Sequence, residues 1–209
     1  NLETYGLLNG AASMLTVDPG TGGALTTPTG GGALFVTTGS ETITMNAPVT
    51  DNGGAVTLVK TGYGGGNLSN GNYQSSATLD LNGVSDYTGD TIINAGTLRI
   101  GTNNTANGAK LGGAGGDYAG DISINSGAML YISTNANQTL SGVISGDGSL
   151  TKSYNGTLTL SGANTYTGKT SMSPATTAGV GTSGVSTFNR VVSGSIETGS
   201  RTVATPVAS

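Results

Sequence analysis

The chain has 209 residues and a formal net charge of −4; 38 residues are glycine, 9% are charged, and none is cysteine, histidine or tryptophan. The absence of histidine and cysteine excludes a Ser-His-Asp triad, a thiol nucleophile, a disulfide and an ordinary zinc site. Seven scattered Lys and Arg residues give no footprint for nucleic acid. We therefore expect no catalytic residue, no cofactor and no nucleic-acid partner.

The composition indicates a sheet-rich fold. Disordered chains combine low hydrophobicity with high net charge, whereas 34% of these residues are hydrophobic and recur in short alternating runs. Gly, Asn, Thr and Ser are residues of turns and polar sheet faces. Apolar runs such as 33–36 are far shorter than the ~20 residues of a membrane helix, so we expect no membrane insertion. The chain begins at Asn1 without a leader segment, which we interpret as processing or excision.

The chain divides into three parts. Residues 1–40 are atypical, and we interpret them as an N-terminal cap or assembly segment. Residues 41–170 hold short repeated strands, in which alternation such as Thr157–Leu160 sends leucine to one face and threonine to the other. Residues 171–209 are again atypical and are interpreted as a cap or as a strand for a neighbouring subunit. No segment has a capped 3.6-residue apolar period, so almost no helix is expected.

Internal repeats occur at three offsets. The matching pairs are 87–100 with 118–132 at an offset of 31, 77–91 with 156–170 at an offset of 79, and 58–60 with 150–152 at an offset of 92. The two larger offsets differ by 13 residues, which places an insertion of that length in 61–76. Insertions confined to one position are typical of repeat architectures.

These repeats favour a solenoid over a sandwich or a barrel. At roughly 20–25 residues per coil, the chain would form on the order of nine coils. Small aliphatic side chains would fill the interior, and Asn, Thr and Ser would hydrogen-bond to their own kind in adjacent coils. Tyr87, Tyr118 and Tyr166 share a repeat position, so we predict a stacked tyrosine ladder at the edge of the core.

Residues 141–170 resemble the autotransporter-associated β-strand repeat, whose pattern runs Gly-x-Gly-x-Leu-x-Lys and then Gly-Thr-Leu-x-Leu-x-Gly-x-Asn-x-Tyr-x-Gly-x-Thr. A weaker copy spans 53–101. The resemblance implies an all-β fold, a right-handed parallel β-helix (β-solenoid), in the passenger of a Gram-negative autotransporter or related surface protein. It also implies a stalk on the cell surface, extracellular or attached to the outer membrane, and it contributes no catalytic residues. After Thr170 the sequence Ser171–Pro174 replaces the expected closing strand.

Two glycine-containing motifs could bind small ligands. Residues 163–170 satisfy a relaxed phosphate-loop pattern, but a phosphate loop needs a following helix and no helix start follows. The run 112–117 begins like a calcium-binding nonapeptide, which makes Asp117 and Asp121 candidate calcium ligands. Because such a site needs tandem copies, we favour a Gly-rich turn here.

Paired carboxylates could support a glycosidase-like site. Asp86 with Asp90, or Asp117 with Asp121, could flank a glycosidic bond, as in β-helical polysaccharide enzymes. Asp90 and Asp121 occupy the same repeat position, however, and a residue that recurs in each coil is more typical of a turn than of an active site.

Three functions therefore compete. The leading hypothesis is a non-enzymatic structural or adhesive module, a rigid stalk that displays loops such as 61–76 to cell-surface or matrix ligands. The alternative is an extracellular fibre subunit that polymerises with copies of itself, through end-to-end stacking or strand donation from the C-terminal segment. The third is a polysaccharide-active β-helix enzyme.

Overall fold

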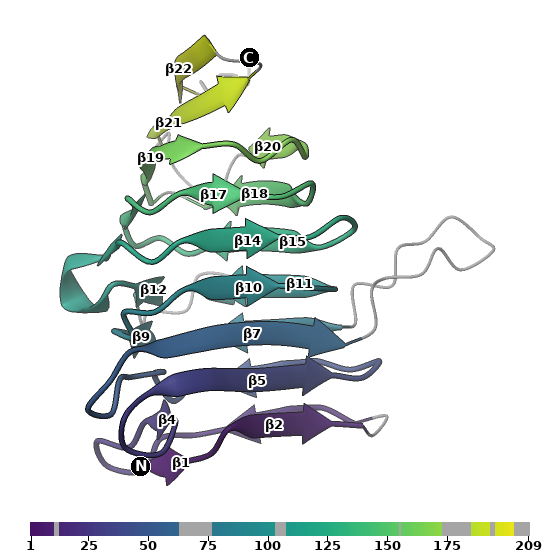
Figure 1. The fold of residues 1–209 in the computed structure, drawn as a ribbon, viewed down its shortest axis with the longest axis vertical. Helices are drawn as coiled ribbons and strands as arrows, with labels where there is room; N and C mark the ends of the chain where they lie inside the picture. Colours follow the sequence, from purple (N-terminus) through teal and green to yellow (C-terminus); the bar gives the residue numbers. More distant parts are fainter. Residues whose placement is uncertain are drawn as a thin grey trace, which may run out of the picture.

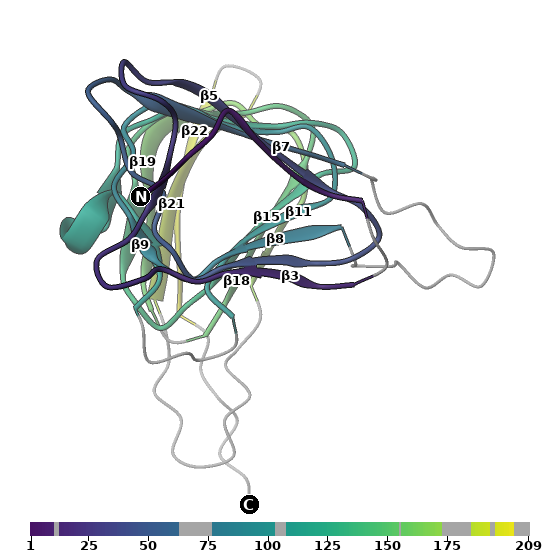
Figure 2. The same ribbon diagram turned by 90° about the horizontal axis from the view of Figure 1, so that it is seen from below.

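The computed structural model describes residues 1–10, 13–62, 77–102, 108–154, 156–172, 185–192 and 195–202, with side chains described up to residue 172. The chain winds as a parallel β-helix, with its coils stacked along the long axis of the molecule (Figure 1). Seen along that axis, the strands enclose a triangular cross-section (Figure 2). The expected all-β class and parallel β-helix are therefore confirmed. One 3₁₀ turn, Gly113–Gly115, is the only helical element among the described residues.

Three faces form the walls. Face A is the six-stranded parallel sheet of β2 (Gly6–Asn9), β5 (Gly32–Thr38), β7 (Val56–Gly62), β10 (Thr91–Ile93), β14 (Ile122–Ile124) and β17 (Ile144–Ser145). Face B is the seven-stranded parallel sheet of β3 (Leu15–Val17), β6 (Ile43–Met45), β8 (Thr78–Leu81), β11 (Thr97–Ile100), β15 (Met129–Ser133), β18 (Ser149–Ser153) and β20 (Thr170–Met172).

Face C is made of shorter sheets. It contains β1 (Leu2–Glu3) with β4 (Leu25–Thr26), β9 (Val84–Ser85) with β12 (Lys110–Leu111), and the five-stranded sheet of β13 (Asp117–Tyr118), β16 (Gln138–Leu140), β19 (Leu158–Asn164), β21 (Val185–Val192) and β22 (Ser195–Thr202). The last two strands, β21 and β22, form an antiparallel pair. On its other edge, β21 pairs in parallel with β19.

Each coil visits faces C, A and B in turn. The seven strands of face B mark seven coils through residue 172, compared with about nine expected for the whole chain. Paired residues on face B are 20 positions apart between Met129 and Ser149 but 36 apart between Ile43 and Leu79. Coil length varies because the corners accept extra residues while the strands keep their register. Residues 1–40 supply β1 to β5, which pair in parallel with the following coils; their role as a cap stays a prediction.

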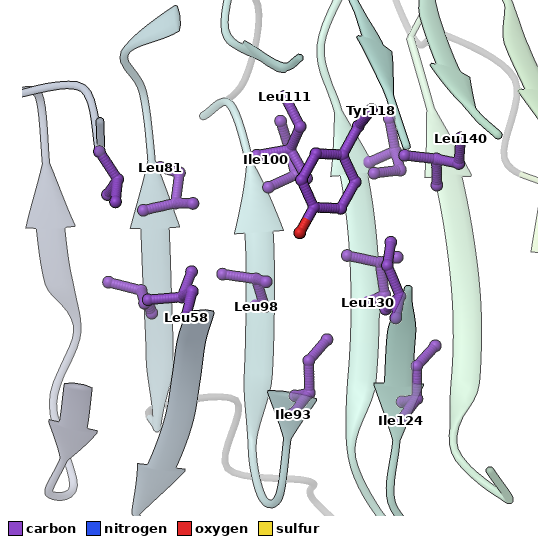
Figure 3. Close-up of a cluster of buried hydrophobic side chains, with 14 of the residues drawn as sticks. Leu58, Leu81, Ile93, Leu98, Ile100, Leu111, Tyr118, Ile124, Leu130 and Leu140 are labelled. Carbon is purple, nitrogen blue, oxygen red and sulfur yellow. The ribbon is translucent and has the colours of Figure 1, made fainter. Parts of the chain in front are cut away.

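The core is a stack of aliphatic rows. Leu79, Leu98, Leu130 and Leu150 pair laterally across four coils of face B, and each is at most 1% exposed. Figure 3 shows Leu98 and Leu130 of this row among the buried side chains. Burial of a leucine stabilises the fold by about 1.5–3 kcal/mol, and the row repeats because period-two alternation turns every second residue inward.

Candidate functional site

A polar ladder, the Asn ladder, runs up one corner of the solenoid. The Asn46 Nδ2 donates to Asp18 Oδ1 at 2.6 Å, and the Asn82 Nδ2 donates to Asn46 Oδ1 at 2.9 Å. The Thr102 hydroxyl then donates to Asn82 Oδ1 at 3.0 Å. Each central asparagine therefore donates to the coil before it and accepts from the coil after it. A Thr37–Thr61 hydroxyl pair at 2.7 Å joins the coils of Asn46 and Asn82 at another position, confirming the predicted stacking of like polar residues.

The candidate catalytic carboxylates join neighbouring coils. Asp90 Oδ1 accepts a hydrogen bond from the Asp121 amide at 3.0 Å, and Asp121 Oδ1 accepts one from the Val143 amide at 2.8 Å. Asp86 is exposed, and its amide donates to the Val49 carbonyl at 3.1 Å. These contacts are those of turn residues that hold the backbone of the next coil.

The two candidate calcium ligands have separate partners. Asp117 Oδ1 accepts from the Ser141 hydroxyl at 2.7 Å, whereas Asp121 binds the Val143 amide. Within the described part of the chain, no group of three or more His, Cys, Asp or Glu residues could hold a metal ion. Calcium binding by Asp117 and Asp121 stays the candidate alternative to the Gly-rich turn that we favour.

Two of the three predicted tyrosines form a buried pair. The rings of Tyr87 and Tyr118 have centroids 5.3 Å apart and are tilted by 60°. The Thr91 hydroxyl lies 2.7 Å from the Tyr87 hydroxyl and 2.8 Å from that of Tyr118, which donates to the Gly89 carbonyl at 2.5 Å. Burial raises the pKa of Tyr87 to about 12 and also raises that of Tyr118. Both phenols therefore stay protonated and structural at physiological pH.

The predicted ladder is wrong for Tyr166. Thr91, four residues after Tyr87, begins a strand of face A, whereas Thr170, four residues after Tyr166, begins a strand of face B. Tyr166 therefore lies at a different corner, where its hydroxyl contacts Thr170 at 2.7 Å. Tyr87 and Tyr166 therefore share a local sequence motif but lie at different positions around the solenoid axis.

A column of glycines allows close approach at the corner between faces C and A. A Cβ on Gly120 would lie 2.4 Å from the Gly89 carbonyl oxygen, one on Gly142 would lie 2.2 Å from that of Gly120, and one on Gly162 would lie 2.1 Å from that of Gly142. Real Cβ atoms do not approach oxygen this closely, so only glycine permits this stacking.

Two lysines point into the interior, where sequence reasoning had not placed any charge. Lys60, at the end of β7, is 0% exposed, and its ammonium donates to the carbonyls of Thr61 at 2.9 Å and Ala95 at 2.8 Å. Lys152, at the end of β18, donates to the carbonyls of Thr134, Ser153 and Tyr154. Burial lowers the pKa of each lysine from 10.5 to about 8.

A sequence signal for the buried lysines existed. Each stands two residues after an inward leucine, Leu58 or Leu150, and period two directs both members of such a pair inward. Carbonyl groups at a corner have no partner in the sheet, because the chain leaves the strand there. The lysine ammonium donates hydrogen bonds to these carbonyls instead.

One ion pair joins two strands on the outside of face B. Arg99 donates from Nε and Nη2 to the two carboxylate oxygens of Asp80, each at 2.6 Å. The Asp80 side chain is only 3% exposed and that of Arg99 is 24% exposed. The hydrogen bonds to Asp80 raise the pKa of Arg99, so the guanidinium stays charged.

Residues 163–170, which match the phosphate-loop pattern, form part of a coil. The last of these residues begins strand β20, and the Lys169 carbonyl accepts from the Leu150 amide at 3.0 Å. A phosphate loop requires a helix at this point, so the strand is incompatible with that chemistry.

Comparison with known families decides what these coils are. The family model of the passenger-associated transport repeat matches residues 73–100 and 150–173. The chain carries autotransporter passenger repeats. The two passenger repeats contain the alternating leucines and the Tyr-x-Gly-x-Thr motifs described above.

A curated relative of the repeat-bearing chain is the adhesin BmaC autotransporter of Brucella suis biovar 1 (strain 1330), which is 35% identical over 174 residues. The match covers 75% of this chain but only 5% of the adhesin, so the chain spans a small part of that relative. No solved structure matches the chain. Passenger repeats place it at the extracellular or outer-membrane-attached surface of a Gram-negative bacterium. In its described part, no helix is long and apolar enough to cross a membrane.

The two passenger repeats are out of phase with the coils. Leu79 of the first repeat lies on face B, whereas its sequence equivalent Leu158 of the second lies on face C. Likewise, Lys60 lies in a strand of face A, whereas its sequence equivalent Lys152 lies in a strand of face B. The 79-residue offset therefore corresponds to a whole number of coils plus one face, which also explains the displacement of Tyr166.

Proposed function

We propose that this chain is a non-enzymatic structural and adhesive module of a surface protein, a rigid stalk that displays loops. The observation that carries the proposal is the unbroken parallel stack of seven coils, joined at the corners by side-chain ladders. Because every coil is bonded to both neighbours, bending would have to break several ladders together. The adhesin relative supports an adhesive setting.

The contacts of the carboxylates support the non-enzymatic part. Asp90 and Asp121 each accept a hydrogen bond from an amide of the next coil. A carboxylate that held a water or a glycosidic oxygen would have to give up that contact, at a cost of about 1–3 kcal/mol for the unpaired amide.

The adhesive part is tested with the full chain on beads. We expect the beads to bind matrix-coated surfaces or cultured cells, and replacement of 63–76 by a Gly/Ser segment of equal length to remove most of this binding without changing the melting temperature. Equal binding by both proteins would refute loop display, and binding by neither would refute adhesion. Release of reducing ends from uronic-acid polymers would refute the non-enzymatic assignment, and its loss in Asp90→Asn would locate the active site.

Apolar exposure in the first coil favours one second candidate, the self-assembling fibre subunit. Leu2 is 50% and Met14 is 66% exposed, although Leu7, Leu15 and Val17 of the same coil pack against the core. An apolar coil with unpaired strand edges can template another chain. Filaments in electron micrographs of the purified chain would support this candidate, and a monomer at high concentration would refute it.

A further inference from the structure

The outside of face A carries an apolar row across its first coils. Phe35, Val59 and Ile92 pair laterally on β5, β7 and β10, and all three point outward because their strand neighbours Leu34 and Leu58 are fully buried. Phe35 is 49% exposed and Ile92 is half-buried, whereas Val59 between them is only 7% exposed. Leu8 of β2, on the same side, is 71% exposed. Leu8 and Phe35 therefore expose two large apolar side chains on neighbouring strands of face A.

An acidic corner runs beside this row. Glu3 accepts from Asn52, whose neighbour Asp51 accepts from the Thr88 hydroxyl at 2.6 Å. Thr88 is two residues before Asp90, which accepts from the Asp121 amide. This chain of contacts aligns four carboxylates along the start of the face A strands, those of Glu3, Asp51, Asp90 and Asp121.

Basic residues of the described coils do not neutralise the corner. Lys60 and Lys152 are buried on backbone carbonyls, and Arg99 is bound to Asp80. Lys110 donates to the Ala114 carbonyl, and Lys169 lies in the seventh coil, where its carbonyl pairs with Leu150 of β18. The outer surface of the first coils is therefore more acidic than the net charge of −4 suggests.

The spacing of the two rows matches an α-helix laid along the solenoid axis. Asp51, Asp90 and Asp121 precede β7, β10 and β14 on three successive coils. Coils repeat every ~4.8 Å and a helix every ~5.4 Å, so these three carboxylates face Lys or Arg on successive turns. Asp90 directly precedes β10 and stands two residues before Ile92, which separates the acidic and apolar rows by roughly 7 Å where the chain is extended. That distance fits within the ~10 Å width of one helix.

We propose that face A docks a cationic amphipathic helix of a partner protein, with its apolar side on Leu8, Phe35 and Ile92 and its basic side on the acidic corner. The inference deepens the proposed adhesive function by naming a partner class. It rests on residues that the replacement of 63–76 leaves unchanged, so loss of loop-mediated adhesion and loss of helix docking are distinguishable.

The test uses a labelled Leu/Lys peptide of about 18 residues, long enough for five helical turns, and a scrambled peptide of the same composition. Fluorescence anisotropy with the full chain should show saturable binding of the helical peptide, weakened by salt, and about tenfold weaker binding of the scrambled one. Phe35→Thr should weaken binding about tenfold, and Asp90→Asn severalfold at low salt, without a change in melting temperature.

Two matched variants serve as controls. Met14→Thr removes an apolar side chain that is 66% exposed before β3, and Asp147→Asn removes a carboxylate bonded to Thr167 at another corner. Neither should change the affinity. Equal binding of the helical and scrambled peptides, or equal losses in the control and face A variants, would overturn the proposal. So would a dimer of the parent chain that Phe35→Thr dissociates, because the occupant would then be a second copy.

Discussion

Substitution of Gly142 by alanine tests how tightly the coils are stacked. The new Cβ would lie 2.2 Å from the Gly120 carbonyl oxygen and 2.7 Å from that of Ala119. An ordinary carbon–oxygen contact is about 3.3 Å or longer, so the two coils must separate by about 1 Å at this corner. That movement would also stretch the hydrogen bond from the Ser141 amide to the Tyr118 carbonyl, now 2.9 Å.

The expected loss for Gly142→Ala combines two terms. Overpacking costs about 1–3 kcal/mol, and the weakened hydrogen bond about 1 kcal/mol more. We expect a total of about 3 kcal/mol, which lowers the melting temperature by about 6–12 °C for a chain of this size. Thermal unfolding of the full chain, followed by circular dichroism, measures this shift.

The matched control is Gly115→Ala. A Cβ there meets nothing within 4 Å, so we expect no loss of stability and a small gain from the stiffer unfolded chain. If Gly142→Ala melted within about 2 °C of the parent protein, the close approach of the coils would not be a constraint, and the steric explanation of the glycine column would be refuted.

Three further predictions concern buried polar groups. Burial lowers the pKa of Lys60 and Lys152 from 10.5 to about 8, so the unfolded chain binds more protons between these pH values. The free energy of unfolding should therefore rise from pH 8 to pH 10.5, by about 3 kcal/mol for each lysine; urea unfolding that showed a flat profile would contradict this. Arg99→Leu leaves the Asp80 carboxylate buried and unpaired and should cost about 3 kcal/mol. The double variant with Asp80→Leu should recover most of it, whereas additive losses in thermal unfolding would count against the pairing. Tyr118→Phe removes a hydroxyl shared between coils and should lower stability by about 1–2 kcal/mol; calorimetry that found no change would show that water replaces it.

The fold could be predicted because its strongest signals are local. Alternation in Thr157–Leu160 places two leucines inside, and both are at most 2% exposed. The match of 87–100 with 118–132 corresponds to one coil, since Thr91 pairs with Ile122 and Thr97 with Met129. These signals depend only on the alternation of side chains along one strand and on pairing between neighbouring coils.

Other features escaped prediction because they depend on the position of a residue around the axis. Tyr166 carries the same local motif as Tyr87 but lies at another corner, and no residue within the motif specifies the face. Lys152 was missed because lysine is almost never fully buried, although its row on face B begins with aliphatic Leu81, Ile100 and Ile132. The length of each single coil also escaped prediction, because corners differ in length while strands keep their register.

The phase difference between the two passenger repeats bears on how such genes can lengthen. The equivalent residues Leu79 and Leu158 lie on different faces, yet both are buried and both continue a parallel ladder. A duplicated segment therefore does not have to contain a whole number of turns to be accommodated. Recombination between repeats could begin and end at any corner. An event with the 79-residue offset would rotate the copied surface by about a third of a turn around the rod, so that one repeated unit presents the same residues in a new direction.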